Sequence, residues 1–352
     1  MNTFEQWLTS PVKKINLDAR NKAEQRQLQL TKPAGSLGQL EMIAIQLAAM
    51  QATETPTADK VHISVFASDH GIVEEGISAF PQAVTGEMIR NFATGGAAIS
   101  ILANELHATL DVINMGSINK LEALTGVDDQ RIAAGTANFA QQAAMTLEQC
   151  QQAISIGRDH VEQKHQVGID IFVAGEMGIG NTSSAAAIAA ALLEIEAKDL
   201  SGPGTGLDAS GVSHKSKIIE QALIKHQDKL SSPMAILQYL GGFEIAALVG
   251  SYLACGKQGL PVIIDGYIAS VAALLAEHIC PGTKDWYIYS HNSAEPGHQH
   301  VLSALQAKPL LDIGMRLGEA SGAATVLPLI RLSCSLHKQM ATFEQAEVSE
   351  KS

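Results

Sequence analysis

The chain has 352 residues, of which 46% are hydrophobic and 17% are charged, and this composition is typical of a globular protein with a substantial core. A net charge of −12 without a basic block argues against nucleic acid and anionic membrane surfaces as partners. The four cysteines form no Cys-x-x-Cys pair, and the sequence shows neither a signal peptide nor a run of roughly 20 apolar residues, so we expect a soluble, cytoplasmic protein with reduced thiols.

Five short apolar runs predict five strands, at residues 61–67, 110–115, 169–174, 262–265 and 286–290. Longer helical patterns separate them. We therefore expect an open, mainly parallel α/β sheet flanked by helices on both faces, which is a Rossmann-like arrangement. Aromatic residues make up only 4% of the chain, so alanine and glycine must fill the space and the helices should pack closely. Each run ends in polar or glycine residues, and ligands of such folds bind at the carboxyl ends of strands.

The distribution of strand patterns predicts two structural units. Residues 61–310 contain all five runs and should form a large α/β domain that binds nucleotide and base. Residues 1–60 and 311–340 show mostly helical patterns and are expected to form a smaller helical subdomain together. Residues 341–352 are polar and acidic, and we expect a flexible tail there.

Two segments in the first hundred residues combine turn residues with side chains that could bind a ligand. Residues 32–41, Lys-Pro-Ala-Gly-Ser-Leu-Gly-Gln-Leu-Glu, indicate a turn that runs into a helix, with a purely structural role as the alternative. Residues 78–85 place small polar groups beside the ring of Phe80. This mixture suits a flat heteroaromatic ligand, and it equally suits an ordinary loop that enters a helix.

Two glycine-rich turns, at residues 175–183 and 201–208, are the most informative feature of the sequence. The first follows an apolar run and precedes an alanine-rich helix, an order that directs backbone N–H groups at an anion. Neither is a Walker loop, because no Gly-Lys-Ser/Thr follows. We interpret the pair as a phosphate cradle; tight turns without a ligand are the alternative. The candidate binding residues are Glu176, Gly178, Gly180, Asn181, Thr182, Ser183, Gly202, Pro203, Gly204, Thr205, Gly206 and, in the following helix, Lys215.

Lys215 could meet a phosphate or a carboxylate, or it could be an ordinary surface lysine. His291, His298 and His300 lie close to Glu295, but their spacing fits no known metal motif, and we predict no metal site there.

Glu319 is the sharpest single candidate for catalysis. It lies among small and apolar residues at the start of a long apolar helical stretch. Burial there would raise the pKa of its carboxyl group and make it a proton acceptor near neutral pH. The alternative is a glutamate that only interacts with the helix dipole. Glu176, on the first glycine turn, offers a second acid to the same crevice.

Six motifs in this order resemble the nicotinate-nucleotide:dimethylbenzimidazole phosphoribosyltransferases of cobalamin lower-ligand assembly, and together they span nearly the whole chain. The motifs are residues 32–41, 68–71, 80–85, 175–182, 202–206 and 316–319. One departure is Ala320, where we expect many relatives to have glycine. We expect the methyl group of Ala320 to make the pocket slightly smaller without preventing the reaction.

The resemblance implies that nicotinate mononucleotide donates its 5-phosphoribosyl group to 5,6-dimethylbenzimidazole, giving α-ribazole 5′-phosphate and nicotinate. It implies that Glu319 is the catalytic base and that the glycine turns hold the 5′-phosphate. Lys215 would hold the phosphate or the departing nicotinate. The implied base-binding residues are Ser78, Phe80, Gln82 and Leu317. A single displacement with inversion needs no covalent enzyme nucleophile, metal or cofactor, and the family resemblance suggests a homodimer.

Two other functions remain open on the sequence. One is a phosphoribosyltransferase that acts on another base, because the shape of a pocket is not readable from one chain. The other is a nucleotide-binding sensor that uses the same phosphate turns without chemistry.

Overall fold

The computed structural model describes residues 3–204 and 206–349 and is built around a six-stranded parallel sheet. The strands are β1 (Val61–Ser68), β2 (Thr109–Gly116), β3 (Val127–Asp129), β4 (Ile171–Met177), β5 (Val262–Ile264) and β6 (Tyr287–Tyr289). Their spatial order, β3-β2-β1-β4-β5-β6, is that of a doubly wound Rossmann-type sheet. The predicted fold class and the five predicted strands are confirmed.

Strand β3, a three-residue strand at the edge of the sheet, was not predicted from the sequence. Two of its residues are acidic and exposed, so no apolar run marks it. The strand forms because β2 lies beside it, with Val112 paired to Val127, and because the Asn114 side-chain amide donates to Asp129 at 2.8 Å. Both contacts come from a neighbouring strand, which a local pattern cannot reveal.

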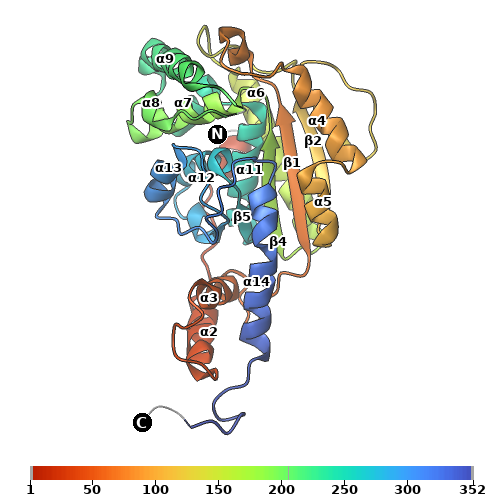
Figure 1. Cartoon of the computed structure of the whole chain (residues 1–352), viewed down its shortest axis with the longest axis vertical. Helices are drawn as coiled ribbons and strands as arrows, with labels where there is room; N and C mark the ends of the chain where they lie inside the picture. Colours follow the sequence, from red (N-terminus) through yellow and green to blue (C-terminus); the bar gives the residue numbers. More distant parts are fainter. Residues whose placement is uncertain (1–2, 205, 350–352) are drawn as a thin grey trace.

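Helices cover both faces of the sheet, and Figure 1 shows α4 and α5 together on one side of β1 and β2. The face that carries these two helices also packs against α3 and α14; their bounds are α3 (Gln39–Met50), α4 (Ala83–Thr94), α5 (Ala98–Glu105) and α14 (Ser321–Gln339). On the opposite face α11 (Phe243–Gln258) and α12 (Tyr267–Ile279) pack on the strands, and the same core continues into α6 (Leu147–Gln166), α7 (Asn181–Leu193), α8 (Ala197–Leu200), α9 (Ala209–His226), α10 (Pro233–Leu240) and α13 (His298–Leu305). Alternate strand residues supply the two cores, as the pleat requires.

Three short 3₁₀ helices and two N-terminal helices complete the fold. The 3₁₀ helices are η1 (Gly71–Glu75), η2 (Gln227–Lys229) and η3 (Thr283–Trp286), and the N-terminal helices are α1 (Thr3–Thr9) and α2 (Leu17–Gln29). Among the helices in the described part of the chain, none is long and apolar enough to cross a membrane.

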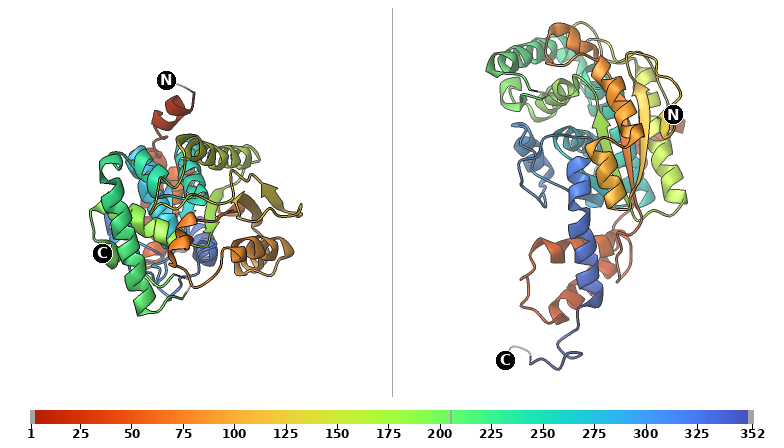
Figure 2. Two further views of the ribbon diagram at one scale, coloured as in Figure 1. Left: turned by 90° about the horizontal axis from the view of Figure 1, so that it is seen from above. Right: turned by 45° about the vertical axis from the view of Figure 1, so that its right-hand side comes forward.

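Helices α2 and α3 lie beside the second half of α14, below the body of the sheet in Figure 1 and in the right-hand view of Figure 2. The contact includes the Arg26 guanidinium, which donates to the carbonyl of His337 at 2.6 Å. The first half of α14 packs on the sheet, so this helix belongs to both regions. The division into a large domain (61–310) and a helical subdomain (1–60 with 311–340) stays a prediction.

The segment after α14 returns to the end of α2. Thr342 forms a β-bridge with Leu30, and the Phe343 amide donates to the carbonyl of Gln29 at 2.9 Å. The flexible tail expected at 341–352 stays a prediction, and its last three residues lie outside the described part of the chain.

Helices α6 and α11 cross at van der Waals distance because each presents a glycine to the other's backbone. A Cβ built on Gly157 would collide with the carbonyl group of Ala247, and one on Gly250 would collide with that of Ile154. This is the close helix packing that the small-residue composition predicted.

We expect Gly157→Ala to lower the free energy of unfolding by about 1–3 kcal/mol, because the added methyl group pushes two buried helix backbones apart. Denaturant unfolding followed by circular dichroism measures this. Gly86→Ala in α4 is the matched control: its Cβ would meet only the ends of the Leu121 and Arg90 side chains, at 3.1 and 3.9 Å, and these ends can shift. Equal stability of the two variants would contradict the account of the α6–α11 contact.

Candidate active site

A cavity of about 470 Å³ opens at the carboxyl ends of β4, β5 and β6. It lies beside the point between β1 and β4 where the chain reverses its direction across the sheet, which is where doubly wound folds bind ligands. The loops after these strands, both glycine-rich turns and the turn before α14 supply its walls. The lining residues are Glu176, Met177, Gly178, Ile179, Asn181, Thr182, Gly204, Gly206, Asp265, Gly266, Tyr267, Ile268, His291, Ser293, Glu295, Arg316, Leu317, Gly318 and Glu319.

The structure brings most of the residues expected from the two glycine turns and from the Glu319 region to this cavity. Eight line it directly: Glu176, Gly178, Asn181, Thr182, Gly204, Gly206, Leu317 and Glu319. Others support the walls without lining them, namely Gly180, Ser183, Gly202, Pro203 and Lys215. Thr205 lies outside the described residues. The roles assigned to these residues stay predictions.

The three base-binding candidates near residue 80 do not line this cavity. Ser78 and Phe80 share a hydrogen-bonded turn, in which the Ser78 hydroxyl donates to the Phe80 carbonyl at 3.1 Å, and the Phe80 ring is half exposed. Gln82 donates to the carbonyl of His70 at 2.9 Å, next to the end of β1. Their role in binding a base stays a prediction.

Glu319 lies in a turn of unusual backbone geometry. Gly318, Glu319 and Ala320 have φ angles of 85°, 61° and 63°, and left-handed backbone at two successive non-glycine residues is strained. The turn is held from both sides. Asp265 accepts a hydrogen bond from the Ala323 amide at 2.8 Å, and Gly175 leaves no room for a Cβ beside Ala320. The strain keeps the Glu319 side chain at the cavity with only 6% of its surface exposed.

Three carboxyl groups gather on this side of the cavity. Burial raises the pKa of Glu319 to about 7, and the nearby Asp265 adds to the shift. Burial also raises the pKa of Glu176 well above its usual range and raises the pKa of Asp265. The Asn181 side-chain amide donates to one oxygen of Glu176. Glu319 is therefore poised to exchange a proton near neutral pH, as catalytic acids and bases are.

Cationic groups gather at the second glycine turn. The Lys215 ammonium donates to the Thr182 hydroxyl at 2.8 Å and to the Gly202 carbonyl at 3.3 Å. Burial lowers its pKa to about 8, against the opposing effect of Glu295. Arg316 donates to the Gly204 carbonyl at 3.3 Å. Together with the N-terminus of α7, whose dipole favours negative charge, these groups make this side of the cavity suited to an anion.

Eleven residues that line the cavity were not in the predicted site, among them Asp265, His291, Ser293, Glu295 and Arg316. A signal existed for the first two, since Asp265 and His291 follow strands β5 and β6 and the strand-end rule pointed to them. Of the histidines considered for a metal, His298 uses both ring nitrogens within the protein. The Ser293 amide donates to one at 2.8 Å, and the Ser270 hydroxyl lies 2.9 Å from the other.

A doubly wound sheet, glycine-rich turns at a helix N-terminus and a buried acid of raised pKa are together typical of α/β enzymes that act on phosphorylated small molecules. A family model described as phosphoribosyltransferase matches residues 12–348. Relatives from Ectopseudomonas mendocina and Pseudomonas aeruginosa strain LESB58, both named nicotinate-nucleotide–dimethylbenzimidazole phosphoribosyltransferase, are 55% identical over 98% of this chain and 99% of theirs. The chain belongs to this phosphoribosyltransferase family.

Solved structures agree with this assignment. The crystal structure of CobT from Thermus thermophilus matches 95% of this chain and 100% of its own, with a TM-score of 0.91 and 39% identity. A second structure, of the nicotinate-nucleotide–dimethylbenzimidazole phosphoribosyltransferase from the same organism, covers 96% of this chain and 100% of its own, with a TM-score of 0.90 and 38% identity.

We expect Glu319→Gln to stabilise the folded protein at pH 8. In the folded state the pKa of Glu319 is about 7, above the reference value of 4.5, so the folded state loses stability as the pH rises from about 4.5 to 7. Glutamine cannot ionise and avoids this loss. The variant should therefore melt at a higher temperature than wild type at pH 8, with a smaller difference at pH 5. A pH-independent difference, or one equal to that of the exposed control Glu105→Gln, would contradict the raised pKa.

Proposed function

We propose that this protein transfers the 5-phosphoribosyl group of nicotinate mononucleotide to 5,6-dimethylbenzimidazole, giving α-ribazole 5′-phosphate and nicotinate, a step in the assembly of the cobalamin nucleotide loop. The observation that carries the proposal is the placement of Glu319, a buried carboxyl group with a pKa of about 7, in the same cavity as an anion-binding turn. The names of relatives at 55% identity over almost the whole chain support the choice of both substrates.

The 5′-phosphate of the nucleotide binds at the glycine-rich turns. The N-terminus of α7 and the ammonium group of Lys215 face it, and the Thr182 hydroxyl next to Lys215 supplies a further hydrogen bond. A bound phosphate favours the charged form of Lys215 and so reverses the effect of burial. Burial raises the pKa of Glu176 well above its usual range, which favours the protonated form and weakens its repulsion of the anionic nucleotide.

The reaction is one displacement at C1′ of the ribose. As one ring nitrogen of dimethylbenzimidazole forms its bond to C1′, the Glu319 carboxylate takes the proton from the other ring nitrogen. The bond from C1′ to the nicotinate nitrogen breaks, and its electron pair neutralises the positive charge of the pyridinium ring. The donor is a β-nucleotide and the product is α, so the attack comes from the opposite face with inversion. Positioning of two rings provides most of the catalysis.

The base lies between the Glu319 turn and the apolar part of the lining. Leu317, Met177 and Ile179 supply apolar surface for a flat ring within reach of Glu319. The family resemblance also assigns Ser78, Phe80 and Gln82 to base binding, although they lie on the loop that follows η1 and outside the lining of this cavity. We further propose that the protein acts in the cytoplasm as a homodimer and binds no nucleic acid, in keeping with its net charge of −12.

The direct test is to incubate the purified protein with nicotinate mononucleotide and dimethylbenzimidazole, without added metal, and to follow both products by chromatography with mass detection. We expect equal amounts of nicotinate and α-ribazole phosphate. Glu319→Gln should reduce turnover about 10²–10⁴-fold, because a general base is lost, while nucleotide binding is retained. Glu105→Gln is the control. Nucleotide binding without base-dependent release of nicotinate would indicate a sensor, and preference for a purine would indicate another acceptor.

The pH dependence of kcat/KM should be bell-shaped. Glu319 acts as carboxylate, so kcat/KM rises with pH through about 7; Lys215 acts as ammonium, so it falls above about 8. Lys215→Met should remove the upper limb and raise the KM for the nucleotide roughly 10–100-fold, because a hydrogen bond to a charged group is lost. Lys217→Met, exposed on the same helix, is the matched control. A profile that is flat between pH 6 and pH 9 would contradict both assignments.

A further inference from the structure

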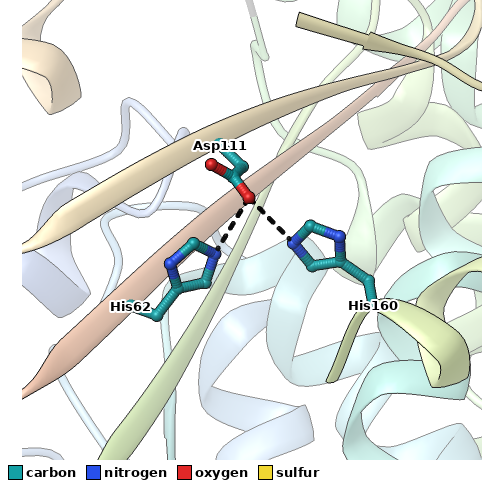
Figure 3. A group of neighbouring side chains, drawn as sticks. All are labelled: His62, Asp111 and His160. Atoms are coloured by element: carbon teal, nitrogen blue, oxygen red, sulfur yellow. Dashed lines mark ion pairs between the residues drawn. The ribbon is translucent and has the colours of Figure 1, made fainter. Parts of the chain in front are cut away.

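His62, Asp111 and His160 form a cluster at the amino ends of the strands, on the opposite end of the sheet from the active-site cavity. His62 lies at the start of β1, Asp111 near the start of β2 and His160 on α6. The parallel register pairs Ser64 with Asp111, and His62 lies two residues before Ser64, so both side chains point to the face that α6 covers. Figure 3 shows a ring nitrogen of each histidine directed at the same oxygen of Asp111.

The distances within this cluster suit a bound cation better than direct contact. The Nε2 atoms of His62 and His160 lie 3.5 and 3.6 Å from Asp111 Oδ2, and the three ligand atoms all lie within 4.8 Å of one another. A tetrahedral zinc ion with bonds of about 2.0–2.1 Å separates its ligand atoms by about 3.3–3.4 Å. The three side chains would therefore have to move closer together by about 1 Å or less for most pairs of ligand atoms to reach these separations.

His160 carries a polar atom that the protein leaves unpaired. Its side chain is 9% exposed, and its Nε2 atom, which points at Asp111, has no hydrogen-bond partner. Buried polar atoms are nearly always paired, so an orphaned imidazole nitrogen directed at a carboxylate needs an explanation. A metal ion between the two would satisfy both.

His62 is oriented by a second hydrogen bond, as metal-binding histidines usually are. Its Nδ1 atom lies 2.6 Å from the Thr109 hydroxyl, and that hydroxyl donates its own proton to the Val61 carbonyl at 3.5 Å. In the tautomer in which Nδ1–H donates to this hydroxyl, the lone pair of Nε2 faces the cluster. The Ser64 hydroxyl, 3.1 Å from this Nε2, is the group that an ion would displace.

Aromatic rings line the side of the cluster that faces the protein interior. The ring of Phe172 stacks on His62 at 5.9 Å, and the ring of Phe66 meets His160 edge-on at 6.0 Å between centroids. Asp111 is 36% exposed and opens the cluster to solvent on the other side. An ion can therefore enter past Asp111 and be shielded from water once it is bound.

Lys164 supplies a positive charge at the same place. Its ammonium pairs with Asp111 Oδ2, and its side chain is 24% exposed, so it can turn out into solvent. Burial first, and then this charge, lower the pKa of His62 to about 3 and that of His160 to about 4.

We propose that His62, Asp111 and His160 bind a divalent transition-metal ion of the Zn²⁺ class, which ties the starts of β1 and β2 to α6, and that Lys164 competes with the ion for Asp111. Two imidazole nitrogens and one carboxylate oxygen are a ligand set that zinc and its neighbours prefer, whereas Mg²⁺ and Ca²⁺ prefer oxygen alone. The site is structural, since it lies at the amino ends of the strands, away from the catalytic cavity.

The test uses the full-length protein, stripped with a chelator and dialysed, and titrated with Co²⁺ alone and then with Zn²⁺ alone. We expect one Co²⁺ per chain with visible ligand-field absorption, displacement of Co²⁺ by Zn²⁺, and a higher melting temperature with Zn²⁺. Asp111→Asn and His160→Gln should each weaken binding at least about tenfold. Lys164→Met should strengthen binding, because it removes the competing cation.

Two controls separate this cluster from other binding. His278→Gln, an exposed histidine on α12, and Glu319→Gln in the cavity should both bind as wild type does. The opposite effects of Asp111→Asn and Lys164→Met distinguish a ligand site from a general loss of folding, which circular dichroism also monitors. The proposal is overturned if neither wild type nor Lys164→Met binds a stoichiometric ion, or if Asp111→Asn and His160→Gln bind it as tightly as wild type.

Discussion

The geometry of the active site depends on one contact between the end of a strand and the start of a helix. Asp265, directly after β5, accepts the amide hydrogen of Ala323 in the first turn of α14. Helix α14 begins after Ala320, which offers no side-chain cap, so Asp265 supplies the negative group that a helix N-terminus favours. This contact fixes the helix relative to the sheet, and the strained turn before it then places Glu319 at the cavity.

The two sides of this cavity differ in their electrostatic character. On the side of β4 and α14, burial raises the pKa of Glu176 and Glu319, whereas Lys215, Arg316 and the N-terminus of α7 favour an anion on the other side. In the proposed function, a nucleotide that bridges the two sides brings its phosphate to the cations and its ribose towards Glu319. Burial of the Glu319 carboxyl group costs stability in the free protein. The same burial raises its pKa towards the neutral range, where it can exchange a proton.

The carboxyl and amino ends of the strands have different roles. At the carboxyl edge the strands end in glycines and acids, which leave a cavity with strained backbone around it. At the amino edge, the starts of β1 and β2 and the helix α6 meet in a cluster of histidines and a carboxylate against aromatic rings. A structural ion at the amino edge would hold the sheet together without restricting the loops that bind substrate.

The sequence alone determined the parallel α/β fold, five of the six strands in the described residues and the two glycine-rich turns, because these depend on local patterns of apolar residues and on short motifs, and it singled out Glu319 as a candidate. Only the tertiary structure placed the short strand β3, the support that Asp265 gives to α14, the approach of Glu295 and Arg316 to the glycine-rich turns, and the meeting of His62, Asp111 and His160. These residues are far apart in the chain. Strand register and helix packing bring them together, and both are set by contacts between elements rather than by any one segment.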